Sequence, residues 1–335
     1  MLLAWMKFKD KMTAIISQEK IRQMASRWLV PSQDTHPLRI HTDTTDFFSL
    51  EYGDVVVLGG KPYLVRHNAK EGRFGIDDDV KFWVKNAIDL KNGNRKIIKL
   101  VFYEKFKSRI GGIEYDCFRS PKKEARILDL VAGHKNFMQG FAVNDEKGNI
   151  VRVIDLIPGR PLSEFIESLK LDHHHYFKEL FPGILDQFME CIQAIEFLHK
   201  NGEKHGDIRR DHIFIDREEN RYRWIDFDFN YRHRENIHSF DLFGLGNILM
   251  FIAGKGDVLL FDLKNQSSPH LDILRDEDLN IVFHNRVANL KKIYPYIPES
   301  LNQVLMHFSK GANWFYENTA QLLSDLEEFK RVSGI

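Results

Sequence analysis

The sequence contains little cysteine, no excess of charge of either sign and no long apolar run. Its 335 residues include two cysteines, Cys117 and Cys191, and two thiols so far apart are not the framework of a disulfide-rich secreted domain. No stretch reaches the roughly 18 apolar residues that a membrane-spanning helix requires. The opening residues lack the apolar core and cleavage site of a signal peptide. We therefore expect a cytoplasmic protein with no membrane span.

The charges of the chain are balanced. It has 48 Lys and Arg residues against 48 Asp and Glu residues, so its formal net charge is zero. Such a chain offers no basic field for nucleic acid or for an anionic membrane, and we expect no nucleic-acid partner. The hydrophobic content of 43% is enough for a substantial core, and the length favours two folding units or one large bilobal unit.

Hydrophobic patterning divides the chain into three parts. Residues 1–45 form a mixed N-terminal extension, residues 46–157 are β-rich, and residues 158–335 are mainly helical. The pattern predicts an α+β protein with a β-rich first lobe, a helical second lobe and a ligand cleft between them. Hairpins are expected at 55–65 and 80–102, two strands at 140–157, and helices at 121–131, 162–170, 175–200, 240–254 and 300–330.

Two acidic turns stand nineteen residues apart. Asp207 follows His205 and Gly206 and precedes the apolar run Ile213-Phe214-Ile215, while Asp226 follows Trp224-Ile225. Two carboxylates placed beside short β-type runs can divide a task, because one can handle a hydroxyl proton while the other holds a metal ion. Phosphoryl transfer needs that division, since its catalysis consists mostly of positioning and charge neutralisation.

These segments resemble the catalytic loop and the metal-binding segment of the protein-kinase superfamily. The resemblance implies a bilobal kinase-like fold with a β-rich N-lobe (46–157) and a helical C-lobe (158–335). It implies that Asp207 orients the acceptor hydroxyl or accepts its proton. By the same resemblance, Arg209 would neutralise charge on the transferring group and Asp226 would hold Mg²⁺ between the phosphates.

The resemblance extends to a nucleotide-binding set in the first half. Lys99, in an apolar strand, resembles the lysine that holds the α- and β-phosphates, and Glu124, twenty-five residues later, matches its partner on a helix. A lysine among apolar residues is costly to bury without a carboxylate, so the pairing also has a physical rationale. The remaining implied ATP-binding positions are Gly72 and Gly75 of a glycine-rich turn and Asp155 and Ile157 of the hinge between the lobes.

The chain departs from the family pattern at His212, where the family has a metal-binding Asn. Imidazole can bind a divalent ion but prefers softer metals than Mg²⁺, and protonation removes its lone pair. We therefore expect activity that favours Mn²⁺ and weakens below neutral pH. The alternative is a nucleotide-binding pseudokinase whose catalysis has been lost.

The acceptor is less defined by the sequence. Only fifteen residues separate Asp226 from Asp241, too few for the activation loop of protein kinases, which favours a sugar, lipopolysaccharide or other small-molecule acceptor. Residues 239–249, where Asp241 would anchor the catalytic loop, and 316–326 resemble Ser/Thr protein kinases instead. The sequence thus predicts an ATP-dependent kinase, Ser/Thr-kinase-like, that uses ATP with Mg²⁺ or Mn²⁺ and phosphorylates a hydroxyl of a protein or small molecule. Lys99, Glu124 and the two acidic turns are expected around one triphosphate.

Overall fold

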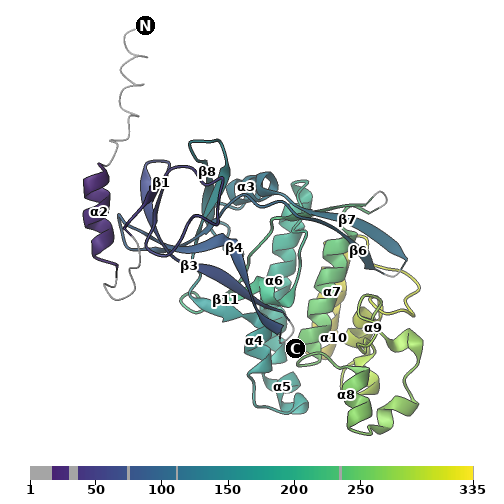
Figure 1. Ribbon diagram of the computed structural model, residues 1–335. Helices are drawn as coiled ribbons and strands as arrows, with labels where there is room; N and C mark the ends of the chain where they lie inside the picture. Colours follow the sequence, from purple (N-terminus) through teal and green to yellow (C-terminus); the bar gives the residue numbers. More distant parts are fainter. Residues whose placement is uncertain (1–16, 30–36, 74–75, 111, 234–235, 335) are drawn as a thin grey trace. The chain divides into compact units, whose positions relative to one another are not determined.

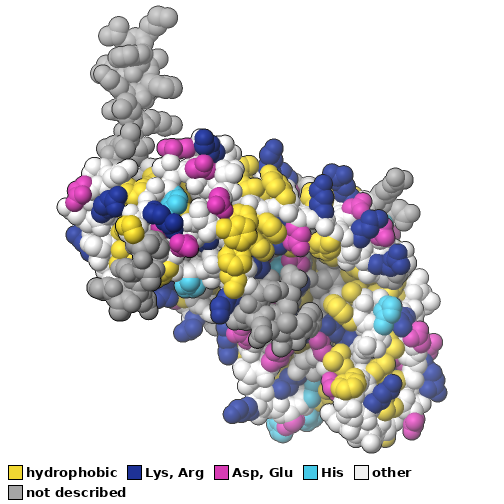
Figure 2. Space-filling model, in the orientation of Figure 1, with side chains coloured by type: hydrophobic (Ala, Val, Ile, Leu, Met, Phe, Trp, Pro, Cys, Tyr) yellow, Lys and Arg dark blue, Asp and Glu magenta, His cyan; other side chains and the backbone are white. Residues whose placement is uncertain are grey.

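The computed structural model describes residues 17–29, 37–73, 76–110, 112–233 and 236–334. The chain divides into two compact units, each described by itself below (Figure 1). The first unit is the β-rich part of the chain and the second is mainly helical, so the predicted α+β fold class is confirmed. On the face seen in Figure 2, basic and acidic side chains are interspersed, in keeping with the balanced composition.

The first unit is built on a seven-stranded sheet. It comprises residues 1–103, 121–133 and 139–156. The strand order is β1-β2-β3-β4-β5-β9-β8, and every neighbouring pair is antiparallel except β1 and β2. The strands are β1 (Ile40–His41), β2 (Val55–Leu58), β3 (Lys61–Arg73), β4 (Ile76–Asp89), β5 (Arg95–Lys99), β8 (Gly140–Asn144) and β9 (Ile150–Asp155), and the helices are α2 (Gln18–Ser26) and α3 (Pro121–Leu130).

Glycines close the predicted hairpins of this sheet. Gly59 and Gly60, with φ of 55° and 73°, turn the chain between β2 and β3, and Gly93, with φ of 78°, turns it between β4 and β5. Positive φ is readily adopted by glycine and is costly for most other residues, and such turns match the twist of antiparallel strands. Both hairpins, the two strands within 140–157 and the helix near 121–131 are confirmed.

A helix from the N-terminal extension is part of the first unit. Helix α2 starts after Ser17, whose side chain caps it. Ile21 and Ala25, four positions apart and therefore on one face, are buried together with Val55 of β2 and Leu64 of β3. The extension thus covers part of one face of the sheet. The sequence did not reveal this structural role.

The second unit contains most of the helices. It comprises residues 104–120, 134–138 and 157–335. Its helices are α4 (Leu162–Glu167), α5 (His173–Glu179), α6 (Phe181–Lys200), α7 (Ser239–Ala253), α8 (Leu260–Asn265), α9 (Glu299–Met306) and α10 (Thr319–Ser333). Its strands are β6 (Lys105–Ile110), β7 (Ile113–Arg119), β10 (Gly159–Pro161), β11 (Ile213–Asp216), β12 (Arg221–Trp224) and β13 (Phe229–Arg232). Across the described ranges, no helix has both the length and the apolarity needed to cross a membrane.

The helical prediction was too coarse toward the C-terminus. The single helix expected at 300–330 is two helices, α9 and α10, separated by residues 307–318. Asn318 begins α10 by accepting a hydrogen bond from the Gln321 amide, and Gly334 ends it with a φ of 67°. Capping residues therefore fixed a boundary that hydrophobic spacing alone did not show.

A three-stranded sheet in the second unit was not predicted. Its order is β13-β7-β6, and it joins residues 105–119 to the strand that directly follows Asp226-Phe227-Asp228. The hydrophobic pattern predicts residues 105–119 in the β-rich half of the chain, whereas backbone pairing with β13 groups them with the second unit. The β6–β7 hairpin is therefore paired with the strand that directly follows the acidic motif.

Candidate active site

The catalytic-loop segment is held by one buried carboxylate. Asp241, at the start of α7, accepts hydrogen bonds of 2.8 Å from the backbone amides of His205 and Gly206, and His199 Nε2 lies 3.0 Å away. Burial works to raise the pKa of Asp241, but these hydrogen bonds and the nearby histidines lower it to about 2. The expected anchoring of this loop by Asp241 is confirmed.

Helix α7 approaches this loop closely because it has a glycine there. A Cβ on Gly244 would lie 2.7 Å from Ile208 Cβ and 2.8 Å from its carbonyl oxygen, closer than real side-chain contacts. Gly206 also requires the flexibility of glycine, since its φ is 83°. The loop next to Asp207 is thus fixed by backbone packing as well as by Asp241.

Asp207 and Asp226 lie on either side of one imidazole. Asp207 Oδ2 is 3.6 Å from His212 Nδ1, and Asp226 Oδ2 is 3.9 Å from His212 Nε2. The side chain of His212 is 5% exposed, whereas those of Asp207 and Asp226 are 19% and 16% exposed. The two acidic turns of the sequence are therefore brought together around His212 within the second unit.

The hydrogen bond of His212 fixes which nitrogen can bind a metal ion. Nδ1 lies 2.8 Å from the Asp207 carbonyl oxygen, which can only accept, so Nδ1 is the donor and the neutral ring has its lone pair on Nε2. The 3.9 Å from Nε2 to Asp226 Oδ2 is less than twice a typical ligand distance of about 2.1 Å. The residues present therefore fit a divalent ion.

Burial gives Asp207 the electrostatics of a proton acceptor. It raises the pKa of Asp207 above its ordinary value, against the lowering effects of His212 and Arg209. A carboxylate with a raised pKa holds an accepted proton more firmly, which favours general-base catalysis near neutral pH.

Arg209 is oriented by a carboxylate that the sequence analysis did not name. Its Nε lies 3.1 Å from Asp211 Oδ1 and its terminal nitrogen 2.5 Å from Asp211 Oδ2, a bidentate pair. Burial works to raise the pKa of Asp211, but His212 and Arg209 lower it below the ordinary value. Asp211 therefore stays ionised and directs the guanidinium.

The first unit contains the paired lysine and glutamate together with a second cation. Lys99 Nζ lies 2.7 Å from Glu124 Oε1, and Arg152 Nε lies 3.0 Å from Glu124 Oε2. Arg152 stands directly opposite Lys99 in the pair of β5 and β9. Its side chain and that of Glu124 are 0% exposed. Two cations thus share one buried carboxylate.

The other expected ATP-binding residues are not brought into a site by the described contacts. Asp155 ends β9, is exposed, and forms an ion pair with Lys96, while Ile157 begins the part of the chain that groups with the second unit. Gly72 lies in β3, and Gly75 lies outside the described residues. Their part in nucleotide binding stays a prediction.

A signal for Arg152 was present in the sequence. It is the only charged residue in the apolar run Ile150-Val151-Arg152-Val153-Ile154, and a charge in a buried strand needs a counter-ion. No comparable pattern marked Asp211, which lies in an ordinary polar stretch.

Comparison with known proteins gives matches to protein kinases. Over 157 residues the chain is 26% identical to CBL-interacting protein kinase 28 of Oryza sativa subsp. japonica, covering 47% of this chain and 31% of that protein. Over 146 residues it is 26% identical to serine/threonine-protein kinase 1 of African swine fever virus, covering 43% of each. Over 98 residues it is 30% identical to human serine/threonine-protein kinase Nek10, covering 29% of this chain and 8% of that one.

The matched segments are partial. The chain spans less than half the length of each of these curated relatives, and no protein-family profile matches it. Among solved structures, the kinase domain of Mycobacterium tuberculosis PknI matches with a TM-score of 0.45 and 13% identity, over 84% of this chain and 99% of that one. The sequence matches show that the chain is similar to protein kinases, and the resemblance inferred from its motifs is confirmed.

Proposed function

We propose that this protein is an ATP-dependent phosphotransferase that transfers the γ-phosphoryl group of ATP to a hydroxyl group. The observation that carries the proposal is the position of Asp207 and Asp226 on either side of His212, at 3.6 Å and 3.9 Å. The sequence similarity to protein kinases supports the same reaction.

Each residue of the second-unit cluster has a separate task in this proposal. Asp207 orients the acceptor hydroxyl and takes its proton, helped by its raised pKa. Asp226 and the Nε2 of His212 hold a divalent ion, Mg²⁺ or Mn²⁺, which neutralises charge on the phosphates when it is bound. Arg209, directed by Asp211, places a fixed positive charge near the transferring group.

The first-unit cluster supplies a cation for the nucleotide. Two cations share the carboxylate of Glu124, and a cation in this cluster can bind an anion such as ATP. Arg152 retains Glu124 when Lys99 turns toward a phosphate, because each cation binds a different oxygen. We propose Lys99 as the residue that grips the α- and β-phosphates.

Similarity to Ser/Thr protein kinases makes a protein hydroxyl the first candidate acceptor. One observation favours a small-molecule or sugar hydroxyl instead. The strand after the acidic motif, β13, pairs with β7, and α7 begins seven positions after β13 ends. A long segment that docks a peptide would need this stretch of backbone, and here the stretch is paired with β7 instead.

The test is ATP consumption by the purified full chain with Mg²⁺ or Mn²⁺, measured over a panel of peptides, sugars and lipopolysaccharide and compared with Asp207→Ala. Turnover that Asp207→Ala abolishes supports the proposal, and the responsive acceptor identifies the substrate class. Binding of the nucleotide without turnover that depends on Asp207 would make the chain a pseudokinase. The expected cytoplasmic location stays a prediction.

A further inference from the structure

The metal-holding turn has a conformation that needs external support. Asp226 has a φ of 60°, in the left-handed region that residues with a side chain rarely adopt. Such a conformation is strained and persists only where surrounding contacts enforce it. The support is expected in the residues that directly follow Asp226.

Arg119 contacts Asp228 and Phe229, two of the residues that follow Asp226. Its terminal nitrogen lies 2.5 Å from Asp228 Oδ2, and its guanidinium carbon lies 4.1 Å from the centre of the Phe229 ring. The next amide, that of Ser120, donates to the Asp228 carbonyl at 2.7 Å. The side chains of Arg119 and Asp228 are 4% and 0% exposed. This contact is therefore shielded from water, and an ion pair is stronger in such a buried place than in water.

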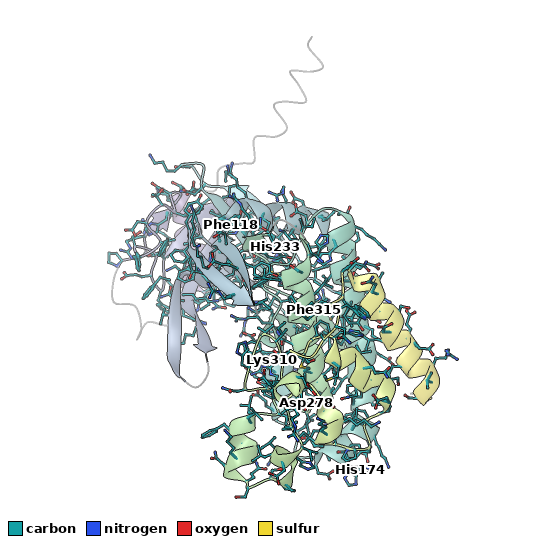
Figure 3. All side chains as sticks on the ribbon, turned by 90° about the vertical axis from the view of Figure 1, so that its right-hand side faces the viewer. Phe118, His174, His233, Asp278, Lys310 and Phe315 are labelled. Atoms are coloured by element: carbon teal, nitrogen blue, oxygen red, sulfur yellow. The ribbon has the colours of Figure 1, made fainter. Side chains whose placement is uncertain are left out.

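The β6–β7 hairpin holds Arg119 in place. Arg119 stands opposite Phe229 in the pairing of β7 with β13, and its second terminal nitrogen lies 3.3 Å from Glu104 Oε2. Figure 3 labels Phe118, which lies on β7, and His233, which directly follows β13. Backbone pairing and two carboxylates therefore define the position of one guanidinium.

Phosphorylation on serine or threonine is not available to order this segment. Residues 227–238 contain neither Ser nor Thr, and Tyr231 is 1% exposed.

We propose that Arg119 is a positioning residue for the metal ligand Asp226. By binding Asp228 and stacking on Phe229, Arg119 enforces the backbone conformation in which Asp226 faces His212. The inference rests on the proposed function, because Asp226 is a metal ligand only there. The competing assignment is that Asp228 is itself a ligand, since Asp226 and Asp228 offer carboxylate oxygens within 4.8 Å of each other.

The experiment compares Arg119→Met, Arg119→Lys, Asp228→Asn and the double variant Arg119→Met/Asp228→Asn in the full chain. Lys107→Met is the matched control, because Lys107 lies on the same hairpin in an exposed pair with Glu114. Binding of Mn²⁺ is measured by electron paramagnetic resonance with a non-hydrolysable ATP analogue, and binding of the analogue is measured separately without metal.

We expect Arg119→Met to weaken Mn²⁺ binding on the order of tenfold to 100-fold, as substitutions beside metal ligands do, with analogue binding unchanged in the absence of metal. Arg119→Lys should recover part of the loss. The double variant should bind Mn²⁺ better than Arg119→Met alone, because Asp228 is then no longer left without its cation. Lys107→Met should match the wild type.

Hydrogen–deuterium exchange of residues 224–232 in the metal-free proteins gives a second readout that needs no nucleotide. We expect Arg119→Met to exchange at least about tenfold faster there and Lys107→Met to be unchanged. Wild-type exchange in a folded Arg119→Met variant would overturn the inference. So would loss of Mn²⁺ binding in Asp228→Asn with normal binding in Arg119→Met. Wild-type protein that binds no Mn²⁺–nucleotide would overturn the proposed function instead, and exchange would then decide whether Arg119 orders the turn.

Discussion

The two charged clusters of this protein are built in opposite ways. In the first unit, the cations Lys99 and Arg152 both bind the carboxylate of Glu124. In the second unit, the carboxylates of Asp207 and Asp226 both lie beside one imidazole, that of His212. Cationic side chains suit a polyphosphate, and carboxylates suit a divalent cation.

The two clusters should also differ in what they contribute, the first mainly to the stability of the fold and the second mainly to activity. A carboxylate that two cations bind in a buried site belongs to the structure, and removing it leaves charges that nothing compensates. A carboxylate whose pKa burial raises, as for Asp207, is held at a cost to the fold, which is typical of residues kept for chemistry. Substitution of Glu124 should therefore lower the stability of the fold, whereas substitution of Asp207 should lower turnover without lowering stability.

Asp207→Asn should give the largest effect on activity. We expect phosphotransfer to fall by about 10²–10⁴-fold, the usual contribution of a general base, with the free energy of unfolding unchanged or higher at neutral pH. The direction of the change in unfolding free energy follows from the raised pKa of Asp207, because the fold disfavours the ionised form of this side chain. Turnover and urea unfolding of the same preparations check both parts. Equal turnover in the variant would remove Asp207 from the mechanism.

Glu124→Gln should give the largest effect on stability. It leaves Lys99 and Arg152 buried without their anion, and breaking a buried ion pair costs about 3–5 kcal/mol. The matched control is Lys96→Met on the same strand, whose partner Asp155 is exposed and whose loss should cost less than about 1 kcal/mol. Urea denaturation measures both. Similar values for the two variants would contradict the contrast.

Asp241→Asn should remove a stabilisation of the fold that is lost at low pH. The pKa of Asp241 is lowered to about 2 from an ordinary 3.8, which corresponds to about 2 kcal/mol. Because the folded pKa is the lower one, this stability is fully present above about pH 4 and is lost as the pH falls toward 2. Unfolding measured across that range should show a weaker pH dependence in Asp241→Asn than in wild type. The exposed control Asp186→Asn should keep the wild-type slope.

His212→Asn should give the smallest effect, a change in metal preference. Replacing imidazole by an amide oxygen should shift the ratio of Mg²⁺- to Mn²⁺-supported turnover toward Mg²⁺, on the order of tenfold. Initial rates with each metal check this. An unchanged ratio would show that His212 is not a ligand.

Local sequence patterns predicted much of the fold. Short apolar runs separated by glycine turns marked the hairpins around Gly59 and Gly93, and helical spacing marked α3, α6 and α7. The β6–β7 hairpin escaped because it is stabilised by pairing with β13, more than a hundred residues later. The break before α10 depends on the capping residue Asn318, a local signal that the wider hydrophobic pattern concealed.

The candidate site was predictable where a motif places residues close in sequence. His205, Asp207, His212 and Asp226 belong to such segments, and the structure brings them together. Arg119 was not found, because its partner Asp228 lies 109 residues away and the sequence gives no sign of that contact. Motifs therefore located the candidate site residues, and only the structure located the side chains that hold them.

In the proposed mechanism, Asp226 and His212 hold a divalent ion on a bound nucleotide. Isothermal titration of a non-hydrolysable ATP analogue into wild-type protein and Asp226→Asn, with and without Mn²⁺, tests it most directly. We expect Mn²⁺ to tighten binding to the wild type by about tenfold or more and to leave Asp226→Asn unaffected. Equal enhancement by Mn²⁺ in both proteins, or none in the wild type, would contradict the claim.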